Sequence, residues 1–91
     1  MVNNPKKWKV VTTSSMKTDV KKIVKSNLSD KYLSILNTLV KNPYLNTQSF
    51  EKLTPPIKSL YSRRLNSENR VVYKILKKEH KVKILSCWGH Y

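Results

Sequence analysis

The amino-acid sequence predicts an α+β fold, in which an N-terminal strand and a two-helix hairpin pack on an antiparallel sheet that a C-terminal three-stranded meander completes. Three observations predict it. Apolar residues recur at helical spacing in the first half, β-prone runs alternate with short polar turns in the second half, and a proline-containing segment separates the halves. Because the helices are not interleaved with the last three strands, they should cover one face of the sheet. The 91 residues suit a single domain, 1–91, with one small core.

The N-terminal half should hold one strand and two helices. Residues 1–7 are polar and basic and are expected to form a flexible arm, while residues 8–13 (WKVVTT) form a β-prone run. Hydroxyl side chains at 13–15 offer a cap for the first helix, Ser29 or Asp30 offers one for the second, and Pro43 ends the pair. The apolar stripes are Met16, Val20, Ile23 and Val24 in the first helix, and Tyr32, Ile35, Leu36, Leu39 and Val40 in the second.

The C-terminal half reads as a loop followed by hairpins. Residues 42–59 carry three prolines with Asn and Thr, which predicts a loop with a helical turn near residues 48–53. Three β-prone runs follow, separated by short polar connections, at residues 60–65, 70–77 and 82–88. Short connections between such runs predict an antiparallel meander.

The charge balance points to a polyanionic partner. The net charge is +14, with 19 Lys and Arg against 5 Asp and Glu, which favours nucleic acid or an acidic protein as partner. A membrane surface ranks last, because the aromatic residues lie mostly in the predicted strands instead of on a basic amphipathic helix. No apolar stretch reaches the ~18 residues of a membrane helix, and no apolar segment follows the N-terminal lysines, so the expected location is the cytoplasm.

The single cysteine, Cys87, excludes an internal disulfide and a cysteine-based zinc site and is expected to be a buried core residue.

The three arginines are the first candidate functional residues. Arg63, Arg64 and Arg70 fall within eight positions, whereas the other 16 basic residues are Lys. A guanidinium matches phosphate oxygens at two points, so the cluster favours a phosphate site over a merely solvated hairpin. Strand alternation places Arg70 opposite the apolar face of its strand. If residues 66–69 form the loop, Leu65 pairs with Arg70 and Arg63 shares the face of Arg70, whereas a bulge would bring Arg64 there instead.

A terminal histidine completes this face. Residues 82, 84, 86, 88 and 90 are expected to share one face of the last strand, which would bring His90 opposite or diagonal to Arg70, within ~7–8 Å. Histidine exchanges a proton near neutral pH. A chain end without a role is the alternative for His90 and Tyr91, and His80 is expected to be an exposed residue of the preceding turn.

One acidic residue precedes the arginine strand. Glu51 is the only acid between Asp30 and Glu68; it is either a solvent-exposed acid or a base held beside the cationic site. Lys52 and Lys58 flank it and could bind RNA backbone.

These groups suit cleavage of RNA. The ribose 2′-hydroxyl is the nucleophile, so the protein needs a base, cations that stabilise the phosphorane charge and an acid for the leaving oxygen. No metal or other cofactor is expected, because no acidic cluster is present.

The segments LYSRRLNSENRVVYKI and VKILSCWGHY resemble the Txe/YoeB branch of the RelE toxin superfamily. The shared pattern is an aromatic-Ser-Arg-Arg-aliphatic run, an Arg-aliphatic-Val-Tyr run and a terminal His-Tyr, with Glu51 at the family's spacing before the arginines. The match is specific over residues 51–91 and weaker over 9–42. Two departures are Thr54, where the family often has a basic residue, and the arm before the first strand.

The resemblance implies a microbial-RNase-like fold, cleavage of mRNA in the ribosomal A site and inhibition by an acidic antitoxin of the YefM type. It further implies that Glu51 is the general base, His90 the general acid, Arg70 the transition-state stabiliser and Tyr91 a positioning or stacking residue. Arg63 or Arg64 would bind phosphate, and a homodimer is possible.

Two readings compete with a ribosome-dependent endoribonuclease. One is a non-catalytic basic module that binds RNA or is a degenerate toxin, and the other is a structural partner of an acidic regulator.

Overall fold

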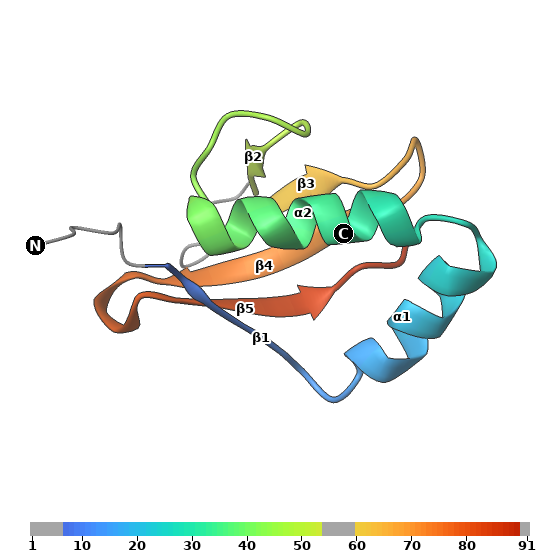
Figure 1. Ribbon diagram of the computed structural model, residues 1–91, viewed down its shortest axis with the longest axis horizontal. Coiled ribbons are helices and arrows are strands. Elements are labelled where there is room, and N and C mark those ends of the chain that lie inside the picture. The colour runs from blue at the N-terminus through green and yellow to red at the C-terminus, as the bar shows by residue number, and fades with distance from the viewer. Residues whose placement is uncertain (1–6, 54–59, 90–91) are drawn as a thin grey trace, which may run out of the picture.

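The computed structural model describes residues 7–53 and 60–89. Two helices pack on a five-stranded sheet with the strand order β1-β5-β4-β3-β2 (Figure 1). The elements in chain order are β1 (Lys9–Thr12), α1 (Met16–Lys25), α2 (Ser29–Lys41), β2 (Glu51–Lys52), β3 (Leu60–Arg64), β4 (Arg70–Leu76), a 3-10 turn (Lys77–Glu79) and β5 (Lys81–Ser86).

The sheet confirms the predicted meander but is mixed instead of antiparallel. β3, β4 and β5 pair antiparallel in sequence order. β1 joins the free edge of β5 in parallel, with Lys9 opposite Lys81 and Thr12 opposite Ile84. The antiparallel sheet was predicted from the short hairpin connections of the last three strands. β1 is joined to the rest of the sheet through the two helices, and such a long connection also allows parallel pairing.

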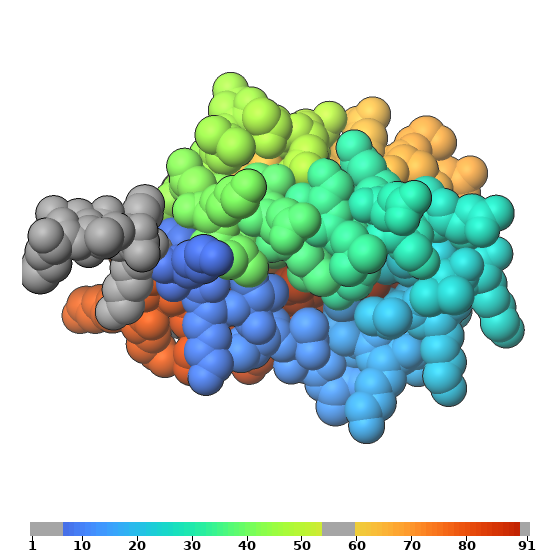
Figure 2. Space-filling view, in the orientation of Figure 1, coloured from blue at the N-terminus to red at the C-terminus, as the bar shows by residue number. Residues whose placement is uncertain are grey.

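The predicted apolar stripes form the core, except that Val24 of α1 is exposed. Both helices bury them against one face of the sheet, and α2 with the segment after it covers the middle of this face (Figures 1 and 2). The buried residues include Met16 and Ile23 of α1, Tyr32, Ile35 and Leu39 of α2, Val71, Tyr73 and Ile75 of β4, and Val82 and Ile84 of β5. Cys87 is also buried, as predicted, and its thiol is free.

The predicted helix caps are absent. Ser15 precedes α1, but its hydroxyl lies 2.9 Å from the Thr13 hydroxyl and makes no cap hydrogen bond. α2 already begins at Ser29, so Ser29 and Asp30 lie in its first turn. The left-handed backbone of Asn27 (φ 59°) turns the chain so tightly that Leu28 leads straight into α2.

The predicted helical turn near residues 48–53 is wrong, because Glu51 and Lys52 form a short edge strand. Glu51 pairs with Ser62 and Lys52 with Tyr61. The left-handed backbone of Gln48 and Ser49 (φ 55° and 54°) reverses the chain just before this strand. A two-residue strand has no sequence period, so the pattern could not reveal it.

A β-bulge changes the face that the end of β5 presents. Tyr73 pairs with Ile84, but the preceding residue of β4, Val72, pairs with Ser86. Leu85 is therefore an extra residue without a partner in β4. Ser86 therefore lies on the opposite face from Ile84, and the prediction that residues 82, 84 and 86 share a face is wrong beyond the bulge.

The N-terminal segment is held by His80, which was predicted to be exposed. His80 is half-buried, and its ring stacks on Trp8 with 3.9 Å between the centroids. Its carbonyl accepts a hydrogen bond from the Lys9 N–H at 3.1 Å. Neither of the helices within residues 7–53 is long and apolar enough to cross a membrane.

Candidate active site

Arg70 and Arg64 stand side by side on the sheet face opposite the helices. Strand alternation buries Val71 and Tyr73 under the helices and directs Arg70 to the other face, as predicted. Arg64 is the direct cross-strand partner of Arg70. The prediction that Leu65 pairs with Arg70 is therefore wrong: Leu65 is buried and belongs to the turn, where its N–H donates to the Asn69 carbonyl at 2.9 Å.

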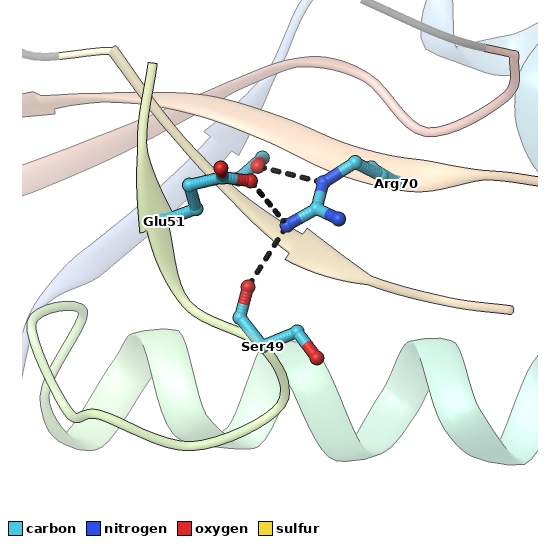
Figure 3. Close-up of polar contacts among 4 residues, drawn as sticks. Ser49, Glu51 and Arg70 are labelled. Atoms are coloured by element: carbon cyan, nitrogen blue, oxygen red, sulfur yellow. Dashed lines mark hydrogen bonds and ion pairs between the residues drawn. The ribbon is translucent and has the colours of Figure 1, made fainter. Parts of the chain in front are cut away.

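Three groups from different segments hold the Arg70 guanidinium. Its Nε donates to the Ser62 hydroxyl at 2.9 Å, and its Nη2 donates to the Ser49 carbonyl at 2.9 Å. The same Nη2 lies 3.1 Å from Oε1 of Glu51 (Figure 3). The Arg70 side chain is 19% exposed and that of Glu51 is 62% exposed. The guanidinium is thus fixed in position while the carboxylate remains open to solvent.

Strand pairing explains why these residues meet. Glu51 lies opposite Ser62 across β2 and β3, and Ser62 lies opposite Val72, two positions from Arg70 on β4. All these positions face away from the helices. A carboxylate that can accept a proton and a guanidinium that can stabilise an oxyanion therefore meet on the sheet face opposite the helices, where the carboxylate is exposed and the guanidinium is half-buried.

Arg63 occupies the opposite face and is fully buried. Its Nε donates to the Tyr73 hydroxyl at 3.0 Å, while Nη1 donates to the Thr47 carbonyl and Nη2 to the Pro43 carbonyl, both at 2.9 Å. Its guanidinium also lies 4.7 Å from the centre of the Phe50 ring. The prediction that Arg63 shares the face of Arg70 is wrong, and its donors are directed at the protein instead of at a phosphate.

Tyr73 completes this buried network. Burial raises the pKa of Tyr73 to about 12, although the neighbouring Arg63 opposes the shift. The phenol therefore keeps its proton and donates it to the Pro43 carbonyl at 2.9 Å. Arg63 and Tyr73 together fasten the segment from Pro43 to Phe50, which leads directly to Glu51.

The remaining predicted site residues are only partly placed. Lys52 is exposed but pairs with Tyr61, on the face opposite from Glu51. Lys58, His90 and Tyr91 lie outside the described residues, so the approach of His90 to Arg70 and the roles of Lys58 and Tyr91 stay predictions.

The described end of the chain is anchored near Arg70. The backbone N–H of Cys87 donates to Oδ2 of Asp19 on α1 at 3.0 Å. The N–H of Gly89 donates to Oδ1 of Asn69 at 2.7 Å. Since Asn69 immediately precedes Arg70, the main chain reaches the neighbourhood of the site one residue before His90.

Two residues of the site escaped sequence reasoning. Ser62 shares a strand face with Arg64, so alternation would have found it once the register was known. Ser49 contributes only its carbonyl, for which no side-chain pattern exists. Within residues 7–53 and 60–89, no group of three or more His, Cys, Asp or Glu side chains is placed to hold a metal ion.

Comparisons with known proteins agree with this architecture. A family model for the YoeB-like toxin of bacterial type II toxin–antitoxin systems matches residues 13–91. The YoeB/ParE toxin from Agrobacterium tumefaciens aligns with a TM-score of 0.79 at 22% identity, covering 91% of this chain and 99% of that one. A comparison with curated proteins found no match.

Two structures from Staphylococcus aureus are also similar. The YoeB–YefM complex gives a TM-score of 0.74 at 28% identity, and the YoeB dimer gives 0.77 at 26% identity. Each alignment covers 92% of this chain and 98% of the other.

Proposed function

The chain belongs to the YoeB-like toxins of bacterial type II toxin–antitoxin systems, and from this membership we propose that it is a metal-independent endoribonuclease that cleaves mRNA in the ribosomal A site. The observation that carries the proposal is the pair formed by Glu51 and Arg70, 3.1 Å apart on the open face of the sheet. A base and a fixed cation are two of the three groups that attack by a 2′-hydroxyl requires.

The proposed chemistry assigns one role to each group. Glu51 removes the proton of the 2′-hydroxyl, Arg70 stabilises the phosphorane oxygens, and His90 gives a proton to the leaving 5′-oxygen. Tyr91 positions or stacks on a base beside the scissile linkage. Arg64, together with Lys58, binds neighbouring phosphates.

The ion pair itself suits this sequence of events. In the free protein Arg70 is bound to Glu51, which occupies one of its donor groups. An incoming phosphate competes for that guanidinium, since its anionic oxygens accept charge-assisted hydrogen bonds as a carboxylate does. Substrate binding would then release the carboxylate to act as the base.

An acidic antitoxin of the YefM type is the proposed protein partner. The YoeB protein of Staphylococcus aureus was solved with YefM and also as a dimer, and this chain carries a net charge of +14. An acidic segment folding over the arginine face would block RNA while neutralising charge. A homodimer is proposed as well, because the YoeB protein of Staphylococcus aureus was also solved as a dimer.

The test is cleavage of a reporter mRNA on programmed ribosomes by the wild type, Glu51→Gln and His90→Ala. Glutamine keeps an acceptor for Arg70 but is no base, so Glu51→Gln should lower the cleavage rate by at least about a hundredfold, as should His90→Ala. Glu68→Gln, in the exposed turn before β4, is the matched control and should cleave like the wild type.

If the wild-type protein binds to the ribosome but leaves the mRNA intact, the proposed endoribonuclease activity is refuted. It would favour the alternative function, a non-catalytic module that binds RNA or the antitoxin.

A further inference from the structure

Four lysines form a continuous row on the sheet face opposite the helices. Lys9 of β1 lies directly opposite Lys81 of β5, and Lys83 of β5 lies directly opposite Lys74 of β4. Lys81 and Lys83 are two residues apart and therefore share this face. We call Lys9, Lys81, Lys83 and Lys74 the lysine row.

The row places like charges in direct cross-strand contact. Such pairs destabilise a sheet unless a counter-charge relieves them. Among the described residues, Lys81 has an ion pair, with Glu79 at 3.4 Å, and no salt bridge to the other three is found. Lys9 and Lys83 are exposed, while Lys74 and Lys81 are half-buried. The surface is therefore arranged to receive an external polyanion.

The row continues from the candidate active site. Lys74 stands four residues after Arg70 on the same face of β4, which corresponds to about 13 Å along the strand. Lys83 is beside Lys74, and Lys81 and Lys9 extend the row to the far edge of the sheet. Arg64, Arg70 and the row thus form one cationic path across three strands and the edge of a fourth.

We propose that the lysine row is a second RNA-contacting site, which binds the sugar–phosphate backbone of the RNA a few nucleotides away from the linkage held at Glu51 and Arg70. The choice of RNA rests on the proposed function, because the path begins at the site where RNA would be cleaved. Lysine ammonium groups contact phosphates as point charges, so the row adds affinity without base specificity.

The experiment measures binding separately from cleavage. Fluorescence anisotropy with a 2′-O-methylated, hence uncleavable, single-stranded RNA of mixed sequence compares the wild type with the double variant Lys74→Gln/Lys83→Gln. The slope of log K against log salt should shrink by about 1.4, since each lost single-strand phosphate contact contributes about 0.7. The loss of affinity should be the same for a second RNA of different base composition.

The matched control is Lys21→Gln/Lys25→Gln on the exposed side of α1, which removes the same charge from the opposite part of the molecule. Its salt slope should stay close to that of the wild type. Equal losses in both double variants would overturn the proposal, because they would reflect net charge alone.

Two further readouts keep the test decisive. The thermal midpoint of Lys74→Gln/Lys83→Gln should rise, since the substitution removes the cross-strand repulsion, so lost binding cannot be ascribed to unfolding. If the variant binds polyglutamate more weakly but RNA as before, the row is a site for an acidic protein and the RNA proposal fails. Failure of the cleavage assay leaves these binding measurements unaffected, so the two proposals fail separately.

Discussion

Arg63 and Arg64 are neighbours in the chain, yet their surroundings are opposite. Arg64 is exposed beside Arg70, whereas Arg63 is fully buried and donates to the carbonyls of Pro43 and Thr47. Within the described ranges no carboxylate forms a salt bridge with Arg63; carbonyl dipoles and the Phe50 ring face its charge instead. Arginine is suited to this place because its planar group offers several fixed donors at once.

Replacing Arg63 should therefore damage the fold more than replacing Arg64. Arg63→Met removes three buried hydrogen bonds from a charged donor, to the Tyr73 hydroxyl and to the Thr47 and Pro43 carbonyls, and should lower the free energy of unfolding by about 3–5 kcal/mol. Arg64→Met should change it by less than about 0.5 kcal/mol, as an exposed substitution does. Urea denaturation monitored by circular dichroism measures both values. Similar stability of the two variants would show that the buried network contributes little.

At the scale of elements, the end of β5 is positioned by a helix that is distant in sequence. Asp19 of α1 accepts the Cys87 N–H at 3.0 Å, and the β-bulge just before it turns Ser86 to the face of Arg70. The chain then reaches Gly89, held by Asn69. Helix α1 is thus connected to the candidate site without contributing a side chain to it.

Asp19→Ala should consequently impair cleavage because the end of the chain is held less firmly near the candidate site, and not because a reacting group is lost. It removes a charged hydrogen-bond acceptor, and we expect the cleavage rate to fall about tenfold, corresponding to a loss of roughly 1.4 kcal/mol in holding the chain end. Single-turnover cleavage on ribosomes measures the rate. Asp30→Ala removes the matching carboxylate from the first turn of α2 and serves as control for the helix-dipole effect. Equal effects from both variants would argue against a positioning role for Asp19.

For the molecule as a whole, sequence periodicity predicted the elements better than their registration. The apolar stripes located both helices, and the β-prone runs located the meander. The pairing of Arg64 with Arg70 was missed because it depends on Leu65 being buried in the turn. The bulge at Leu85 and the parallel docking of β1 were missed as well, since both arise from long-range packing.

In the candidate site, too, the residues could be predicted from the sequence, whereas the contacts between them could not. Residue types and the resemblance singled out Glu51 and Arg70, and strand alternation gave the face of Arg70. Their contact depends on β2, a strand of two residues, and on a backbone carbonyl of Ser49. Neither leaves a pattern in the sequence, because the left-handed turn at residues 48–49 is occupied by ordinary polar residues.

The buried core should also make the protein sensitive to alkali. Burial, aided by the charge of Asp19, raises the pKa of Cys87 from 9.0 to about 12, and burial chiefly raises that of Tyr32 from 10.0 to about 12. Burial also raises the pKa of Tyr73 from 10.0 to about 12. In each case the folded state holds the proton more tightly than the unfolded state does. The resulting stability is therefore complete below the unfolded pKa and is lost as the pH rises toward about 12.

Between pH 9 and 10 the thiol should make the largest single contribution to the loss, because its unfolded pKa of 9.0 lies below the 10.0 of the tyrosines, which contribute increasingly as the pH approaches 10. The thiol should lower wild-type stability there by up to about 1.4 kcal/mol per pH unit, so the stability of Cys87→Ala should fall less steeply once its constant cavity cost is subtracted. Deprotonation of lysines relieves self-repulsion in both proteins equally, so the difference between their urea denaturation curves isolates the thiol. Parallel pH profiles for the two proteins would mean that Cys87 ionises as easily in the folded state as in the unfolded one.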